Sequence, residues 1–218
     1  MNGKKLNLGC GADIKEGYLN KNPYVDFKLT KTPSTRTFLT DEELGQITKN
    51  NLGGNKSLMM VRDIFIFSVY TGLRFEDAQR LTMDSVTKEN KGKYSLRIKQ
   101  EKTEESLAIP LLKPALNIIS KYDKSPERTV MNRVLPTFSN QKLNTYLKVI
   151  AELTGIKKNL THHVARHTCA TTILLSNEVP IEAVSKWLGH TNIKTTQLYA
   201  KITNDYLQNV ANKLENKI

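Results

Sequence analysis

The chain has 218 residues, enough for one sizeable domain or for one domain with a small appendage. Its formal net charge of +12 points to a polyanionic partner, either nucleic acid or an anionic membrane surface, although a merely basic soluble protein carries such a charge too. The two cysteines, Cys10 and Cys169, have neither the number nor the spacing of a disulfide framework or a metal site. No apolar signal segment opens the chain, and the longest apolar run, residues 64–70, is too short to span a membrane. We therefore expect a cytoplasmic protein with reduced thiols, no membrane contact and no cofactor.

Residues 1–22 contain the glycine turn Leu8-Gly9-Cys10-Gly11 after a short apolar segment. This turn is similar to the first motif of AdoMet-dependent methyltransferases, whose glycines let the backbone approach the ligand. The strand–helix units that such a fold requires do not follow, so we expect no cofactor binding here. The same residues can instead form a short helix that leads into a linker at residues 22–37, where Pro23 and Pro33 disfavour regular structure.

Helical periodicity dominates the rest of the chain. Thr40 is a candidate N-cap and Glu43 completes a capping box, in a helix that we expect to end at residues 52–55. Residues 57–70 are apolar on more than one face, which favours a central position in the core. We expect a loop at residues 124–136 and further helices at residues 73–81, 113–122, 139–155 and 205–217, with two or three more within 160–199. In the helix at 139–155, the residues expected to face inward are Leu143, Tyr146, Leu147, Ile150 and Leu153.

The period of the pattern changes between residues 83 and 110. Tyr94, Leu96 and Ile98 alternate with polar residues, and an apolar segment at residues 106–110 follows after a polar turn. This pattern predicts a β-hairpin with a third strand near residues 84–86. The expected fold class is therefore mainly α with a small antiparallel β-sheet (α+β).

The stretch from Leu160 to Tyr199 carries the chemistry. It contains H-x-x-R at residues 163–166, L-G-H at residues 188–190, and Tyr199 nine residues after the last of these histidines. Imidazoles, a guanidinium and a phenol suit the attack of a protein hydroxyl on a phosphodiester. The stretch strongly resembles the C-terminal motifs of the tyrosine recombinases, the integrases of phages and bacterial mobile elements, and the resemblance extends over residues 38–209.

The resemblance implies a set of catalytic residues. Arg74, in T-G-L-R, and Arg166 would form a two-armed clamp on the phosphate, with Asp77 orienting Arg74 or tying its helix to the core. Lys102, in the turn of the hairpin, would protonate the departing 5′ oxygen, with Lys99 as the competing candidate. The other members of the set are His163, which takes the tyrosine proton or holds a phosphate oxygen, His190, which donates to the phosphate, and Tyr199, the nucleophile.

Two further histidines lie beside this set. His162 cannot share the helix face of His163, so we interpret it as a bystander. His167 is expected to form a structural hydrogen bond within the fold. Because arginines, a lysine and histidines supply the positive charge, the resemblance implies no metal ion.

The implied reaction is site-specific recombination. Tyr199 would form a 3′-phosphotyrosyl link, and the released 5′ hydroxyl would attack the partner duplex through a Holliday junction. The implied partners are double-stranded DNA attachment sites, a homo-tetramer assembled on DNA from monomers in solution, and accessory DNA-bending proteins. Residues 38–218 would be the catalytic domain, and residues 1–37 a linker preceded by the end of a core-binding domain or a fusion scar. The alternatives are strand passage of the type IB topoisomerase kind and a non-catalytic DNA-binding fragment.

Overall fold

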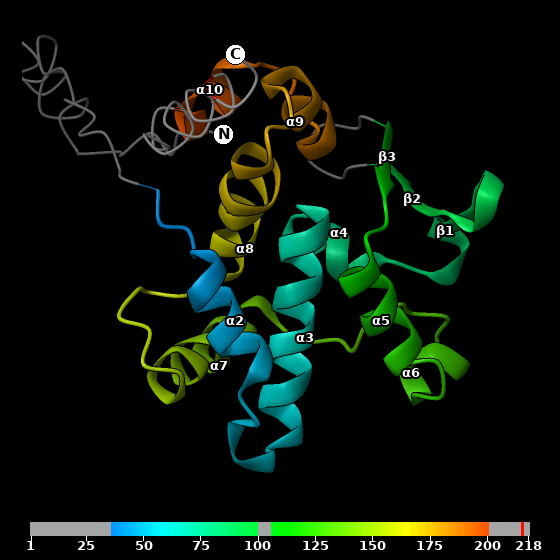
Figure 1. Ribbon diagram of the computed structural model, residues 1–218. Helices are drawn as coiled ribbons and strands as arrows, with labels where there is room; N and C mark the ends of the chain where they lie inside the picture. Colours follow the sequence, from blue (N-terminus) through cyan, green and yellow to red (C-terminus); the bar gives the residue numbers. More distant parts are fainter. Residues whose placement is uncertain (1–35, 100–105, 201–214, 216–218) are drawn as a thin grey trace, which may run out of the picture. The chain divides into compact units, whose positions relative to one another are not determined.

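We describe a computed structural model of the chain for residues 36–99, 106–200 and 215, and these residues belong to one compact unit (Figure 1). The glycine turn at residues 9–11, Lys102 and the predicted last helix at 205–217 lie outside the described residues, except for helical Glu215. The described residues form mostly helices and one small antiparallel sheet, which lies at one edge of the helices in Figure 1, and this confirms the expected fold class. No helix among them is long and apolar enough to cross a membrane.

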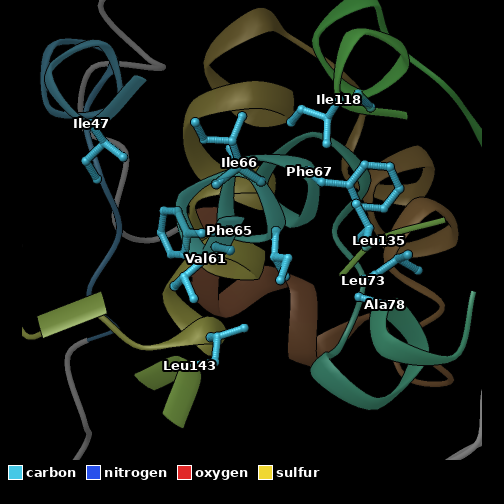
Figure 2. Close-up of a cluster of buried hydrophobic side chains, with 14 of the residues drawn as sticks. Ile47, Val61, Phe65, Ile66, Phe67, Leu73, Ala78, Ile118, Leu135 and Leu143 are labelled. Atoms are coloured by element: carbon cyan, nitrogen blue, oxygen red, sulfur yellow. The ribbon is translucent and has the colours of Figure 1, made fainter. Parts of the chain in front are cut away.

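Helix α3, Lys56–Thr71, is the centre of the core and contacts α5, α7 and α8 (Figures 1 and 2). Apolar side chains on more than one of its faces are buried, as the sequence pattern predicted. Asn55 caps its first turn by accepting from two backbone N–H groups, and Gly72 ends it in the left-handed conformation with φ 72°. A Cβ atom at Gly72 would lie 2.6 Å from Leu188 Cδ2, so this position needs glycine for space as well as for its backbone.

Helix α2, Asp41–Lys49, precedes α3 and begins with the predicted capping box between Thr40 and Glu43. It ends at Lys49, earlier than predicted, because residues 52–54 form a separate 3-10 turn with Gly53 at positive φ. After α3, the short helix α4, Phe75–Arg80, starts directly after Arg74. Its first turn therefore lies next to the end of α3, and this is the region where the site forms.

The sheet has the order β1–β2–β3, with strands Val86–Lys88, Tyr94–Lys99 and Ser106–Pro110, all antiparallel. The register pairs Ser95 with Pro110 and Lys99 with Ser106, so the hairpin that would carry Lys102 is confirmed. Strand β1, which was predicted near residues 84–86, begins two residues later than predicted because residues 83–85 form a 3-10 turn.

Helices α5, Lys113–Lys121, and α7, Asn140–Leu153, agree with the predicted ranges. Two expectations nearby are wrong. The segment at 124–136 is not all loop, because Ser125 caps a short helix, α6, at Pro126–Thr129. Leu153 does not face inward, since it lies in the last turn of α7 and is 52% exposed.

Residues 160–199, which contain the C-terminal motifs, fold into a series of short helices. Helix α8, His162–Thr168, continues into a π-helical segment at residues 169–174 and a 3-10 turn at 175–177. Helix α9, Ile181–Leu188, and helix α10, Lys194–Ala200, follow and lie against this segment (Figure 1). Cys169 lies at the junction, fully buried and in no disulfide, and burial raises the pKa of its thiol to about 12.

Candidate active site

Arg166 is the most firmly held of the predicted residues. It lies in α8 and is 2% exposed. Its two terminal nitrogens donate to the carbonyl oxygens of Gly72, at 2.7 Å, and Leu188, at 2.6 Å. Burial and the charge of Arg74 lower its pKa to about 10, so the guanidinium stays cationic at neutral pH. Arg166 thus joins the ends of α3 and α9 through its own hydrogen bonds.

Arg74 occupies the N-cap position of α4 and lines the same cavity as Arg166 and His163. The cavity has a volume of about 420 Å³. The Nη1 atom of Arg74 is buried and has no hydrogen-bond partner among the described residues. Asp77, in the first turn of α4, is a buried residue that lines the same cavity, and its charge raises the pKa of Arg166. Two guanidiniums and an imidazole therefore face one space that is large enough for a phosphate group.

His163 and Arg166 lie on one helix, as the H-x-x-R spacing predicted. His163 is exposed at the cavity, and its ring meets the ring of His167 edge-on with centroids 4.3 Å apart. His162 is buried instead. Ser68 gives its hydroxyl proton to the Ile64 carbonyl, so its oxygen accepts from His162 Nε2 at 2.9 Å. Burial lowers the pKa of His162 to about 3, and the residue stabilises the fold as a neutral imidazole.

Tyr199, on α10, is docked in the protein interior and is 1% exposed. Its hydroxyl oxygen lies 2.8 Å from Nδ1 of His167, the residue after Arg166. Arg36 lies over one face of its ring, with the guanidinium carbon 4.9 Å from the centroid. Burial raises the pKa of Tyr199, and the charges of Arg36 and Arg166 partly offset that rise. The phenol is therefore protonated at neutral pH and hydrogen-bonded to a potential proton acceptor.

His190 lies parallel to the Tyr199 ring, with centroids 6.3 Å apart and an angle of 4° between the planes. Gly189 places it there, because the left-handed conformation at φ 63° ends α9 and turns the chain sharply. Nδ1 of His190 lies 2.8 Å from Thr196 Oγ1 on α10. Burial and the charges of Arg166 and Arg74 lower the pKa of His190 to about 3, so it is neutral.

The structure thus brings Arg74, His163 and Arg166 to one cavity and holds His190 and Tyr199 beside them. Two residues at Tyr199 were missed as functional candidates. His167 had a signal, because residues 163 and 167 are one helical turn apart and share a face. Arg36 had none, since its contact with Tyr199 joins opposite ends of the described chain. Lys99, the alternative to Lys102, ends β2 and is exposed.

Comparison with known proteins identifies relatives of this arrangement. Residues 37–205 match the model of the Phage integrase family. Tyrosine recombinase XerC of Oceanobacillus iheyensis is 27% identical over 206 residues, which cover 89% of this chain and 66% of the relative. Tyrosine recombinase XerA of Pyrococcus furiosus is 29% identical over 211 residues, with coverage of 91% and 68%. The chain thus spans about two thirds of the length of these curated relatives.

Solved structures show the same fold at lower identity. The crystal structure of XerA recombinase has a TM-score of 0.66 at 19% identity, covering 84% of this chain and 66% of that one. XerH site-specific recombinase, in a post-cleavage complex with its difH substrate, has a TM-score of 0.64 at 21% identity and coverage of 84% and 54%. The family match over most of the chain confirms the resemblance seen in the motifs. This chain belongs to the Phage integrase family and has the fold of a tyrosine recombinase catalytic domain.

Proposed function

We propose that this chain is the catalytic domain of a site-specific DNA recombinase whose nucleophile is Tyr199. The observation that carries the proposal is the short contact between the Tyr199 hydroxyl and His167, beside a cavity lined by Arg74 and Arg166. A phenol needs a proton acceptor and nearby cations before it attacks at neutral pH. Both are in place, and membership of the family supports the same chemistry.

The arginines bind the phosphate in this proposal. Arg166 is fixed by the carbonyls of Gly72 and Leu188, so it presents its charge without rearrangement. Arg74 has a buried nitrogen without a partner in the described part of the chain, and a phosphate oxygen would supply one. His163 is exposed and lines the cavity together with Arg74 and Arg166, so we assign it to a phosphate oxygen.

His167 takes the proton in the first step. The phenol oxygen of Tyr199 attacks the phosphorus, its proton passes to Nδ1 of His167, and the bond from phosphorus to the 5′ oxygen breaks. His167 is a weak base in the free protein, because burial lowers its pKa to about 3. The negative phosphodiester raises that pKa when it enters the cavity. Lys102 remains the proposed donor of the proton that the 5′ oxygen receives.

In the second step, the 5′ hydroxyl of a partner strand attacks the phosphotyrosine and Tyr199 regains its proton. The phosphodiester bond is conserved, so no energy source is required. We propose a homo-tetramer on two DNA sites, because lambda integrase, with a TM-score of 0.63 to this chain, has been solved as a tetramer bound to a Holliday junction. Recombination of a bacterial mobile element in the cytoplasm, with accessory DNA-bending proteins, is the setting that we propose for this activity.

The test is covalent capture of DNA. The wild type is incubated with nicked duplexes that carry a randomised segment, and DNA that stays bound in detergent is recovered and sequenced. We expect an enriched sequence with the wild type and none with Tyr199→Phe. Tyr146→Phe is the matched control, because it removes a half-buried phenol oxygen on α7, away from the cavity.

The outcomes separate the alternatives. Adducts that persist in Tyr199→Phe would place the nucleophile elsewhere. Binding without adducts would indicate a DNA-binding fragment. Relaxation of supercoiled DNA without strand exchange between captured sites would indicate a topoisomerase.

A further inference from the structure

The residues that lead into α2, which we call the lead-in segment (residues 36–40), are attached to the helix that carries Arg166. The backbone N–H of Leu39 donates to Thr168 Oγ1 at 3.0 Å, and Thr172 Oγ1 donates to the Leu39 carbonyl. The Leu39 side chain is fully buried. Because both partners lie in α8 or in the π-helical segment after it, the lead-in segment has a fixed position relative to α8.

A lysine strengthens this attachment. Nζ of Lys158 donates to the Phe38 carbonyl at 2.9 Å and to the Glu43 carboxylate at 2.6 Å, and it lies 5.6 Å from the centre of the Phe38 ring. The chain is therefore held on both sides of Leu39, between the loop after α7 and the start of α2. Arg36 is only two residues before Phe38, so the same attachments restrict the position of its backbone.

Arg36 uses this position to reach Tyr199. Its guanidinium carbon lies 4.9 Å from the centre of the phenol ring, within the range of a cation–π contact. The Tyr199 hydroxyl, in turn, is bound by His167, the residue before Thr168. Helix α8 thus supports both the nucleophile and the segment that places a cation over it.

The surroundings of the phenol make this cation important. Among the described residues, the groups that act on Tyr199 or lie against it include Arg36, Arg166, His167, His190 and Cys169. The two histidines, each with a pKa of about 3, and the thiol, with a pKa of about 12, are neutral at pH 7. Of these groups only the two arginines are charged, and Arg166 already donates to two carbonyls. Arg36 is therefore the second cation at the phenol, and it also hydrogen-bonds to the Tyr199 side chain.

We propose that Arg36 is a positioning residue for the nucleophile, which holds the Tyr199 ring in its docked orientation and stabilises the negative charge that develops on the phenol oxygen. The inference rests on the proposed function, in which that oxygen attacks DNA. It also implies that displacement of the lead-in segment from α8 lowers the reactivity of Tyr199.

The first test needs no activity. Wild type, Arg36→Gln, Arg36→Lys and Lys49→Gln are labelled with 3-fluorotyrosine, whose phenol is more acidic, and the Tyr199 signal is assigned by its loss in Tyr199→Phe. We expect Arg36→Gln to raise the pH of Tyr199 ionisation by about one unit, and Arg36→Lys to raise it less. Lys49→Gln removes an exposed charge at the end of α2 and should leave the ionisation unchanged. A titration in Arg36→Gln identical to that of the wild type would overturn the proposal.

The second test uses a captured nicked duplex. At saturating DNA, Arg36→Gln should slow adduct formation about tenfold, with partial rescue by Arg36→Lys and an unchanged half-saturating DNA concentration. The proposal is refuted if Arg36→Gln forms the adduct at the wild-type rate but binds DNA more weakly, with a slope of log affinity against log salt concentration that is smaller by about one. Arg36 would then be a simple phosphate contact. If the wild type forms no adduct at all, the proposed function fails, and the fluorine titration still decides the role of Arg36.

Discussion

Arg74 and Arg166 face the same cavity, but the protein holds them differently. Arg166 donates to two carbonyls that belong to the ends of α3 and α9. Arg74 has a buried nitrogen without a partner among the described residues. Arg166 therefore contributes to the fold and to the proposed chemistry, whereas Arg74 is available to a ligand.

Lysine substitutions should separate these contributions. Arg166→Lys keeps the charge but cannot donate to both carbonyls, so we expect a loss of about 2 to 3 kcal/mol in the free energy of unfolding. Arg74→Lys should change that free energy by less than about 0.5 kcal/mol. Both should reduce adduct formation by about a hundredfold or more, because each removes a forked donor from the phosphate. Urea unfolding and the capture assay measure the two effects, and equal destabilisation by both substitutions would contradict this distinction.

His167 forms a hydrogen bond within the fold, as predicted, but its partner is the Tyr199 hydroxyl, which the sequence did not indicate. Substitution of His167 by asparagine keeps a polar group near the Tyr199 hydroxyl but removes the proposed proton acceptor. We expect the single-turnover rate of adduct formation to fall by about a hundredfold, with DNA affinity unchanged. The comparison is His163→Asn, which should weaken binding of the phosphate without changing the ionisation of the Tyr199 phenol. If His163→Asn abolishes the reaction and His167→Asn does not, His163 is the proton acceptor.

The motif residues lie near one another in the structure, but their contact partners were not predictable from the sequence. Each residue of the candidate set has a local signature in the sequence, such as the turn at Gly189 before His190. The residues recognisable in this way are Arg74, His163, Arg166, His190 and Tyr199. The contact of Arg36 with Tyr199 has no local signature, since it depends on the path of the chain between α8 and α10. The residue that binds the Tyr199 hydroxyl likewise depends on the rotation of α8, which helical spacing alone does not decide.

At the scale of elements, the end of α3 is the point where the site is assembled. Gly72 ends the helix at positive φ, accepts from Arg166 and packs against Leu188 of α9. Its replacement by alanine combines backbone strain with a contact at 2.6 Å that the buried Leu188 must relieve. A change at this one position therefore disturbs α3, α8 and α9 together.

Two glycine substitutions isolate that contact. Gly155→Ala has a similar φ of 71° but nothing within 4 Å of the added methyl group, so we expect a cost of about 1 kcal/mol in the free energy of unfolding. Gly72→Ala should cost about 2 kcal/mol more, because the methyl group also overpacks the interface with α9. Thermal and urea unfolding of both variants test the difference. Equal costs would show that α9 yields without strain.

Elements were predictable where caps or long periodic runs specify them. The capping box at Thr40 and the apolar run of α3 are such cases, and both are confirmed. Helix α6 has a single turn, too short for a hydrophobic period to appear, and proline at its first position also suits a loop. The π-helical segment after α8 was not predictable, because its hydrogen bonds depend on packing against α3, α9 and α10.

At the scale of the whole molecule, buried neutral histidines couple folding to pH. The native pKa of His162 is about 3 because the imidazole is buried against α3, whereas an unfolded histidine has its ordinary value near 6.5. The unfolded chain thus binds more protons than the native protein below pH 6.5. The contribution of neutral His162 to the free energy of unfolding is therefore complete above pH 6.5. It is lost progressively as the pH falls from 6.5 toward 3.

Between pH 7 and pH 5, this one residue should account for a loss of about 2 kcal/mol in the free energy of unfolding. Urea unfolding of the wild type and of His162→Gln at the two pH values measures it. Glutamine can still donate to Ser68 but does not titrate, so the variant should be less stable at pH 7 and should lose about 2 kcal/mol less on acidification. His167 and His190 remain in both proteins, so their contributions cancel in the comparison. The same loss in both proteins would mean that His162 is not held neutral by burial, and the acid sensitivity of the domain would then come from the histidines at Tyr199.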